Sequence, residues 1–149
     1  MTTSTSIEQH QLCTFYLDKF FFGIGVEKVQ EIVRYQKITR VPLAPPEVRG
    51  LMNLRNQIVT AIDLRDRLDL PEYRGDMLPI NVVVKIDEEM ISLLVDDVGD
   101  VLEVSQEQFE SSPETLTGKV SKLIRGAYKL EERLLLILDV EKVVDLTGY

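Results

Sequence analysis

Residues 48–70 of this chain occur in a second copy. The first copy runs from an apolar segment through the polar residues 53–57 to a second apolar segment and an aspartate, and the same order returns 76 residues later without a gap. A chain built twice from one supersecondary plan is predicted to form two similar units. The matched residues include Arg49 and Arg125, Gly50 and Gly126, Leu54 and Leu130, Asp63 and Asp139, and Leu70 and Leu146.

An offset of 69 residues links the segments upstream. It places Val26–Val29 on Val95–Val98. The same offset places Glu31 on Asp100. The two offsets differ by seven residues, which a polar loop at 106–118 can absorb. Each half is therefore predicted to supply a hairpin, a strand, a connector, a second hairpin that starts at a glycine, and a short capped helix.

The first copy predicts a strand, a tight turn, a strand and a helix. Ile58–Ile62 is apolar on both faces, which is typical of a strand buried on both sides or closed into a barrel. Asn56 tolerates the left-handed backbone that a two-residue hairpin needs, and Arg55 beside it is expected to project from the tip into solvent. Asp63 is expected to cap a helix over 64–70.

Strands dominate the rest of the chain. Hairpin turns are predicted at 18–19 and 87–89, and a connector rich in proline at 41–47. Only 64–70 and 140–146 have helical spacing, so small β-barrels are favoured over parallel βαβ units, which need long crossover helices. The remaining predicted strands are 12–17, 20–26, 29–35, 80–86, 90–95, 98–104, 123–128 and 134–138.

Composition excludes several classes of partner. The 149 residues suit one compact domain or two small lobes. A net charge of −8 argues against binding to nucleic acid or anionic lipid, because such binders need a concentrated basic surface. The sequence lacks both an apolar run of eighteen residues and a signal-peptide pattern, so we expect a cytosolic protein that does not insert into a membrane.

The sequence offers no catalytic constellation. His10 is the only histidine and lies in the polar N-terminal segment, and Cys13 lies in an apolar run, where a small buried hydrophobe is expected. Asp96, Asp97 and Asp100 lack the glycine and the ligand spacing of a calcium loop. We therefore predict a non-catalytic module without cofactor or metal.

The two copies differ in the charge at the hairpin tip. Arg55 and Asn56 in the first copy face Glu131 and Glu132 in the second. A charge that is reversed on a retained scaffold is easier to explain by recognition than by folding.

A second candidate for recognition is the predicted strand 29–35. Alternation places Val29, Glu31 and Val33 on one face, if no bulge intervenes. A carboxylate among apolar neighbours fits either a partner contact or an edge charge that discourages aggregation, and the sequence leaves both open.

Four motifs together resemble the CheW family of bacterial chemotaxis coupling proteins over about residues 12–146. They are Phe22–Ile24, Val29–Ile32, Arg49–Arg55 and Ile62–Arg65, in that order and spacing. The resemblance implies a mainly β fold of two five-stranded SH3-like barrels packed together, with short helices after each second hairpin. The expected organisation is a flexible tail (1–11) and a CheW-like domain (12–149), whose lobes span roughly 12–78 and 79–146, with strand exchange between them left open.

The resemblance also implies an adaptor that joins the histidine kinase CheA to the cytoplasmic tip of methyl-accepting chemoreceptors. It places the regulatory domain of the kinase against the first barrel, where the apolar Val29 and Val33 face would supply contact area, and the receptor in the groove between barrels. The implied kinase-binding residues are Val29, Glu31, Ile32 and Gly50. The implied receptor-binding residues are Asn53, Arg55 and Asn56.

Two positions depart from the family pattern. The family usually has glycine where Asn56 stands and proline where Thr60 stands, yet we expect the hairpin to persist because asparagine tolerates a left-handed turn. Two other functions stay open. One is a CheW-like scaffold in a pilus-motility or other non-flagellar chemosensory array, and the other is a small-molecule sensor that uses the groove between barrels as a pocket.

Overall fold

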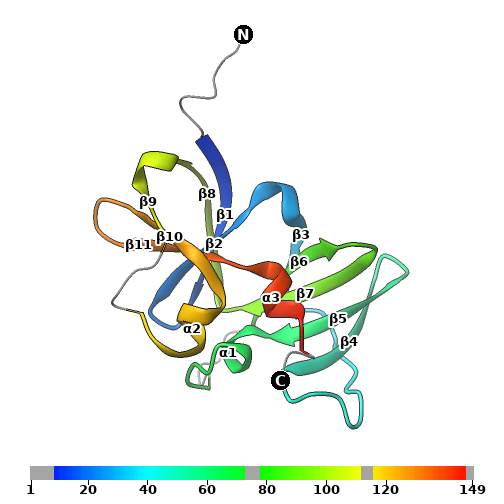
Figure 1. Cartoon of the computed structure of the whole chain (residues 1–149). Helices are drawn as coiled ribbons and strands as arrows, with labels where there is room; N and C mark the ends of the chain where they lie inside the picture. Colours follow the sequence, from blue (N-terminus) through cyan, green and yellow to red (C-terminus); the bar gives the residue numbers. More distant parts are fainter. Residues whose placement is uncertain (1–8, 73–77, 112–115, 147–149) are drawn as a thin grey trace.

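The computed structural model describes residues 9–72, 78–111 and 116–146, and most of them lie in antiparallel strands (Figure 1). The strands are β1 (Gln9–Leu17), β2 (Phe20–Gly25), β3 (Val29–Val33), β4 (Val48–Leu54), β5 (Gln57–Asp63), β6 (Ile80–Ile86), β7 (Glu89–Val95), β8 (Asp97–Ser105), β9 (Phe109–Glu110), β10 (Ile124–Lys129) and β11 (Leu134–Leu138). The helices are α1 (Leu64–Arg67), α2 (Gly118–Lys122) and α3 (Val140–Val144), with 3-10 turns η2 (Val26–Lys28) and η3 (Gln106–Gln108).

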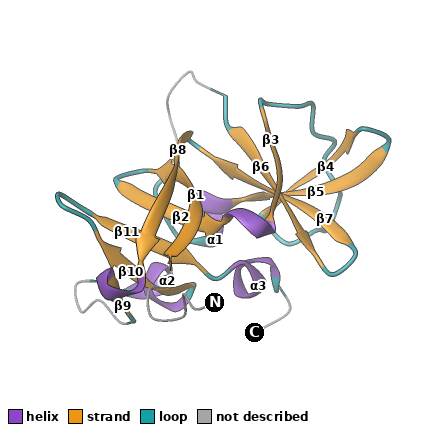
Figure 2. Cartoon of the chain, turned by 90° about the horizontal axis from the view of Figure 1, so that it is seen from above, coloured by secondary structure: helices purple, strands orange, loops and turns teal. Residues whose placement is uncertain are grey.

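The strands form two sheets. One has five strands in the order β3-β6-β7-β5-β4, and the other has six in the order β8-β1-β2-β11-β10-β9. The sixth strand of the larger sheet, β9, is only two residues long. Figure 2 shows the sheets side by side with α1 and α3 near their junction. The mainly β architecture expected from the sequence is confirmed, with a short helix after each second hairpin.

The two sheets do not follow the contiguous lobes 12–78 and 79–146. The β1–β2 hairpin of the first half joins the sheet of the second half, and the β6–β7 hairpin of the second half joins the sheet of the first. Parallel pairing makes the exchange, since β2 runs beside β11 and β7 beside β5. Phe22 pairs with Leu136 and Ile91 with Thr60, which are equivalent pairs under the offsets of 69 and 76 residues.

The second hairpins of the two halves match in detail. The pairing of β4 with β5 shifts register between Val48 and Gly50, and that of β10 with β11 shifts between Ile124 and Gly126. A Cβ atom added at Gly50 would lie 2.3 Å from the Thr39 carbonyl oxygen. One added at Gly126 would lie 2.7 Å from the carbonyl oxygen of Glu110. Both glycines therefore let a neighbouring segment approach the bulged strand closely.

The helices that follow the second hairpins are capped as the sequence predicts. The Asp63 carboxylate accepts hydrogen bonds from the backbone N–H groups of Arg65 and Asp66 at the start of α1. Asp139 accepts one from the N–H of Lys142 at the start of α3. Each carboxylate satisfies donors that the first helical turn leaves unpaired. In the described residues, no helix is long and apolar enough to cross a membrane.

Both faces of the central strands are buried because there are three apolar clusters. A large one is shared between the sheets and includes Phe15 and Phe22, whose ring centroids lie 5.7 Å apart. A second, around Phe21, lies within the six-stranded sheet, and a third, around Met52, lies within the five-stranded sheet. The expected two-sided burial of β5 is confirmed except at Ile58, which is 64% exposed beside the hairpin tip.

The structure corrects two boundaries. Strand β1 begins at Gln9, because residues 9–11 pair with β8, so these residues are not part of the expected tail; residues 1–8 lie outside the described residues. The expected polar loop 106–118 contains η3 and β9, and α2 begins at its last residue. Neither segment is long enough to produce a recognisable period in the sequence.

Candidate functional site

The tip of the β4–β5 hairpin is a two-residue turn with left-handed backbone at both positions. Arg55 has φ of 52° and Asn56 has φ of 67°, which is the type I′ pattern that matches strand twist. The Asn53 Oδ1 atom accepts a 3.1 Å hydrogen bond from the backbone N–H of Asn56. Asparagine thus keeps the turn where the family usually has glycine, and Asn53 braces it from within the hairpin.

Arg55 does not project freely into solvent, which corrects the expectation. Its Nε donates to both Glu31 carboxylate oxygens at 3.1 Å, and one Nη atom donates to Oε2 at 2.7 Å. The Arg55 side chain is still 74% exposed, whereas that of Glu31 is 20% exposed. The hydrogen bond from Arg55 lowers the pKa of the Glu31 carboxyl below its usual value. The pair joins the β4–β5 tip to β3, at the other edge of the same sheet.

The β3 strand presents a different residue from the one that alternation predicts. A register shift falls between Val29 and Glu31. Val29 packs against the shared core, and Val33 packs against the cluster around Met52. The expected contact area from the Val29 and Val33 face is therefore largely taken up inside the protein. Ile32 is 42% exposed and is the apolar side chain that β3 offers to a partner.

Gly50 is buried, so a partner cannot rest on it directly. The connector between β3 and β4 covers it, with Ile38 and the Thr39 carbonyl in the place a side chain would take. Thr39 and Leu51 exchange backbone hydrogen bonds of 2.7 and 2.8 Å. What lies at the surface over Gly50 is the connector itself.

Ile58 is a residue that the sequence did not single out. It pairs with Asn53 across the hairpin, next to the turn, and its side chain is largely exposed. Alternation assigned Ile58 to an apolar face, but the hairpin tip extends beyond the cover of the core. An exposed apolar residue beside Asn53 and Arg55 adds contact area to that surface.

Comparison with known proteins places this arrangement in a family. The model of the CheW-like domain matches residues 11–147. The chain belongs to the CheW-like family. It is 33% identical over 144 residues to the chemotaxis protein CheW of Treponema pallidum, covering 91% of this chain and 82% of that protein. It is 38% identical over 125 residues to CheW of Bacillus subtilis, covering 83% of this chain and 80% of that protein.

A solved structure shows the same fold. The scaffolding protein TtCheW from Thermoanaerobacter tengcongensis superimposes with a TM-score of 0.86, over 95% of this chain and 97% of that one, at 23% sequence identity. Curated relatives of this CheW-like chain carry the name of chemotaxis proteins, which supports a role in chemotaxis signalling.

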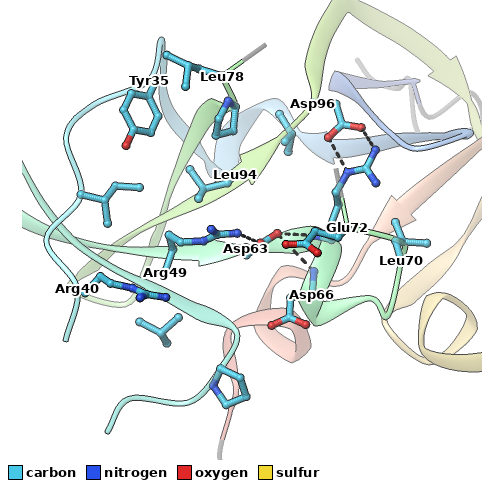
Figure 3. A pocket seen from close by; sticks show the side chains of 16 residues that line it. Tyr35, Arg40, Arg49, Asp63, Asp66, Leu70, Glu72, Leu78, Leu94 and Asp96 are labelled. Carbon is cyan, nitrogen blue, oxygen red and sulfur yellow. Dashed lines mark hydrogen bonds and ion pairs between the residues drawn. The ribbon is translucent and has the colours of Figure 1, made fainter. Parts of the chain in front are cut away.

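This CheW-like protein also has a cavity of about 650 Å³ between the connector, β4, α1 and the end of β7. Figure 3 shows Arg49 pointing at Asp63, with which it forms an ion pair. Arg65 in the same wall donates to the two Asp96 carboxylate oxygens at 2.9 and 2.6 Å. The charges hold elements of the protein together, so the cavity gives the small-molecule sensor no specific support.

The Arg65 pair lies where the two sheets meet. Asp96 occupies the single position between β7 and β8, which belong to different sheets, and its other hydrogen bond comes from the backbone N–H of Asp18 in the β1–β2 turn. The Arg65 side chain is only 12% exposed, and the hydrogen bond to Asp96 raises its pKa further. Arg67 of α1 in turn donates to the carbonyl oxygens of Lys142 and Val143 at the end of α3. These contacts fix the sheets relative to each other.

Proposed function

We propose that this protein is a non-catalytic adaptor that couples chemoreceptors to the histidine kinase CheA in bacterial chemotaxis. Its work is to bind the cytoplasmic tip of a methyl-accepting chemoreceptor and the regulatory domain of the kinase at the same time. It acts in the cytosol and is recruited to membrane receptor arrays through these contacts.

The observation that carries the proposal is the ion pair between Glu31 and Arg55. Family resemblance assigns Glu31 to the kinase-binding residues and Arg55 to the receptor-binding residues. In this chain the two side chains share three hydrogen bonds. The two proposed surfaces are therefore continuous, and a partner that engages one member of the pair changes the electrostatic setting of the other.

On the kinase side, Ile32 supplies exposed apolar area and Glu31 supplies charge. Val29 supports the strand from within, and Gly50 acts through the connector that it allows to approach β4. On the receptor side, Asn53 and Asn56 hold the turn that presents Arg55. A charge at the rim of an interface mainly sets register and discrimination between partners, while apolar neighbours supply affinity.

Reconstitution tests the proposal. Purified protein, cognate CheA and receptor-containing membranes are mixed, and co-sedimentation of each component and autophosphorylation of the kinase are measured. We expect CheA to sediment with the membranes, and its phosphorylation to respond to receptor ligand, only when this protein is present. Kinase binding and kinase control that are the same without this protein would overturn the adaptor function.

A further inference from the structure

Leu43 is the most exposed apolar side chain of the described residues. Its relative exposure is 105%, so no part of the protein covers it, and Val41 two residues earlier is 39% exposed. Single exposed apolar residues are common on protein surfaces and by themselves indicate nothing. The backbone that carries Leu43 gives it more weight.

Leu43 occupies a turn position that does not suit leucine. The backbone N–H of Ala44 donates to the Val41 carbonyl oxygen, which closes a four-residue turn with Pro42 second and Leu43 third. Leu43 has φ of 64°. Proline followed by a residue with positive φ is the type II pattern, and its third position favours glycine or asparagine because a Cβ atom is strained there. The chain thus keeps a leucine where two other residues would fit the fold better.

The turn is also rigid. Pro42 fixes the backbone before Leu43, and Pro45 and Pro46 fix it afterwards. The backbone N–H of Val48 donates to the Pro45 carbonyl oxygen at 2.9 Å, which closes the next turn. An apolar side chain held on a stiff loop loses little conformational freedom when it enters a partner, so it is suited to act as an anchor.

The position of the turn indicates which partner it meets. The connector that carries Leu43 is the segment that covers Gly50 through Ile38 and Thr39. It enters β4 at the end opposite the β4–β5 tip (Figure 1). Leu43 is therefore continuous with the proposed kinase-binding surface rather than with the turn that presents Arg55.

We propose that Leu43 is an apolar anchor that inserts into a hydrophobic pocket on the regulatory domain of the kinase. The inference rests on the proposed adaptor function and adds to it a residue that determines kinase affinity. Strain in the Pro42–Leu43 turn is tolerated because the binding surface needs leucine there.

Leu43→Gly and Leu43→Asn test the anchor, since both residues suit a positive φ. We expect each variant to bind full-length CheA about tenfold more weakly, because a buried leucine side chain is lost from the interface. We also expect each to melt about 2 °C higher than the wild-type chain, because turn strain is relieved. Val101→Thr is the control, since Val101 is 57% exposed on β8 and lies outside the proposed kinase surface; its CheA affinity should equal wild type.

Opposite changes in melting temperature and affinity distinguish an anchor from a structural leucine. Variants that melt lower and bind weaker together would overturn the inference, as would variants that bind CheA with wild-type affinity. Weakened binding to receptor membranes with unchanged CheA affinity would overturn the assignment to the kinase. If the wild-type chain itself fails to bind CheA, the adaptor function fails, and the inference fails with it.

Discussion

Arg55 and Glu31 are 24 residues apart in the chain, yet the guanidinium group of one donates three hydrogen bonds of 2.7 to 3.1 Å to the carboxylate of the other. Arg55 lies in the turn after β4, and Glu31 lies on β3, so the pair links the two edges of the five-stranded sheet. Both side chains are accessible to a partner at the rim of the barrel.

Arg55→Glu is expected to reduce co-sedimentation with receptor membranes by roughly tenfold, because it reverses a charge at the proposed receptor surface. The melting temperature should stay close to wild type, since exposed ion pairs contribute little to stability. Lys85→Glu is the control, because it reverses an exposed charge on β6, away from the hairpin tip, and should leave receptor binding unchanged. Global unfolding of the Arg55 variant would show that Arg55 is structural.

Titration of the Glu31 carboxyl should reveal its partner. Arg55 lowers the pKa of Glu31 in the folded protein, so the pair is fully formed at neutral pH and above the ordinary glutamate range. It is lost as the pH falls through the lowered folded pKa. Arg55→Ala should move the midpoint of the Glu31 titration, followed by NMR of the side-chain carboxyl, to higher pH. An unchanged midpoint would mean that the pair does not persist in solution.

Gly50→Ala is expected to destabilise the protein by about 3 kcal/mol, the sum of a strained backbone and a steric overlap. Gly50 has φ of 150°, and an added Cβ atom would meet the Thr39 carbonyl. Gly118→Ala is the matched control, because Gly118 has φ of 71° but no atom within 4 Å of the added Cβ. It should cost about 1 kcal/mol. Chemical denaturation measures both, and equal costs would show that the connector yields freely.

Asp96→Ala is expected to lower the free energy of unfolding by about 2 kcal/mol, since it removes the main partner of a mostly buried arginine and the acceptor for the Asp18 N–H. Asp100→Asn changes an exposed carboxylate on the same sequence segment and should alter stability by less than about 0.5 kcal/mol. Urea denaturation compares the two. A loss confined to Asp96→Ala would establish that its contacts hold the junction of the sheets together.

Patterns that depend on local chemistry were predictable from the sequence. The turn at Asn56 and the caps at Asp63 and Asp139 follow from which residues accept a left-handed backbone or pair with free helical N–H groups. The bulges at Gly50 and Gly126 occupy equivalent positions, as the repeat implies. Each of these features is set by interactions within a few residues of the chain.

The candidate site was only partly predictable, because exposure depends on what covers a side chain. Alternation grouped Val29 with Val33, but the sheets bury both and leave Ile32 at the surface. The Gly50 position indicated a close approach without indicating that the connector makes it. Leu43 gave no periodic signal, since its distinction is complete exposure on a strained turn.

The sequence by itself determined that this protein is built from two copies of one plan, with strands, turns and capped helices at matched positions. Only the tertiary structure decided how the copies combine. The hairpins β1–β2 and β6–β7 exchange between sheets through parallel pairs, and Arg55 turns back onto Glu31. Periodicity states which residues share a face, but strand partners and long-range ion pairs are selected by the packing of the whole chain around the shared core.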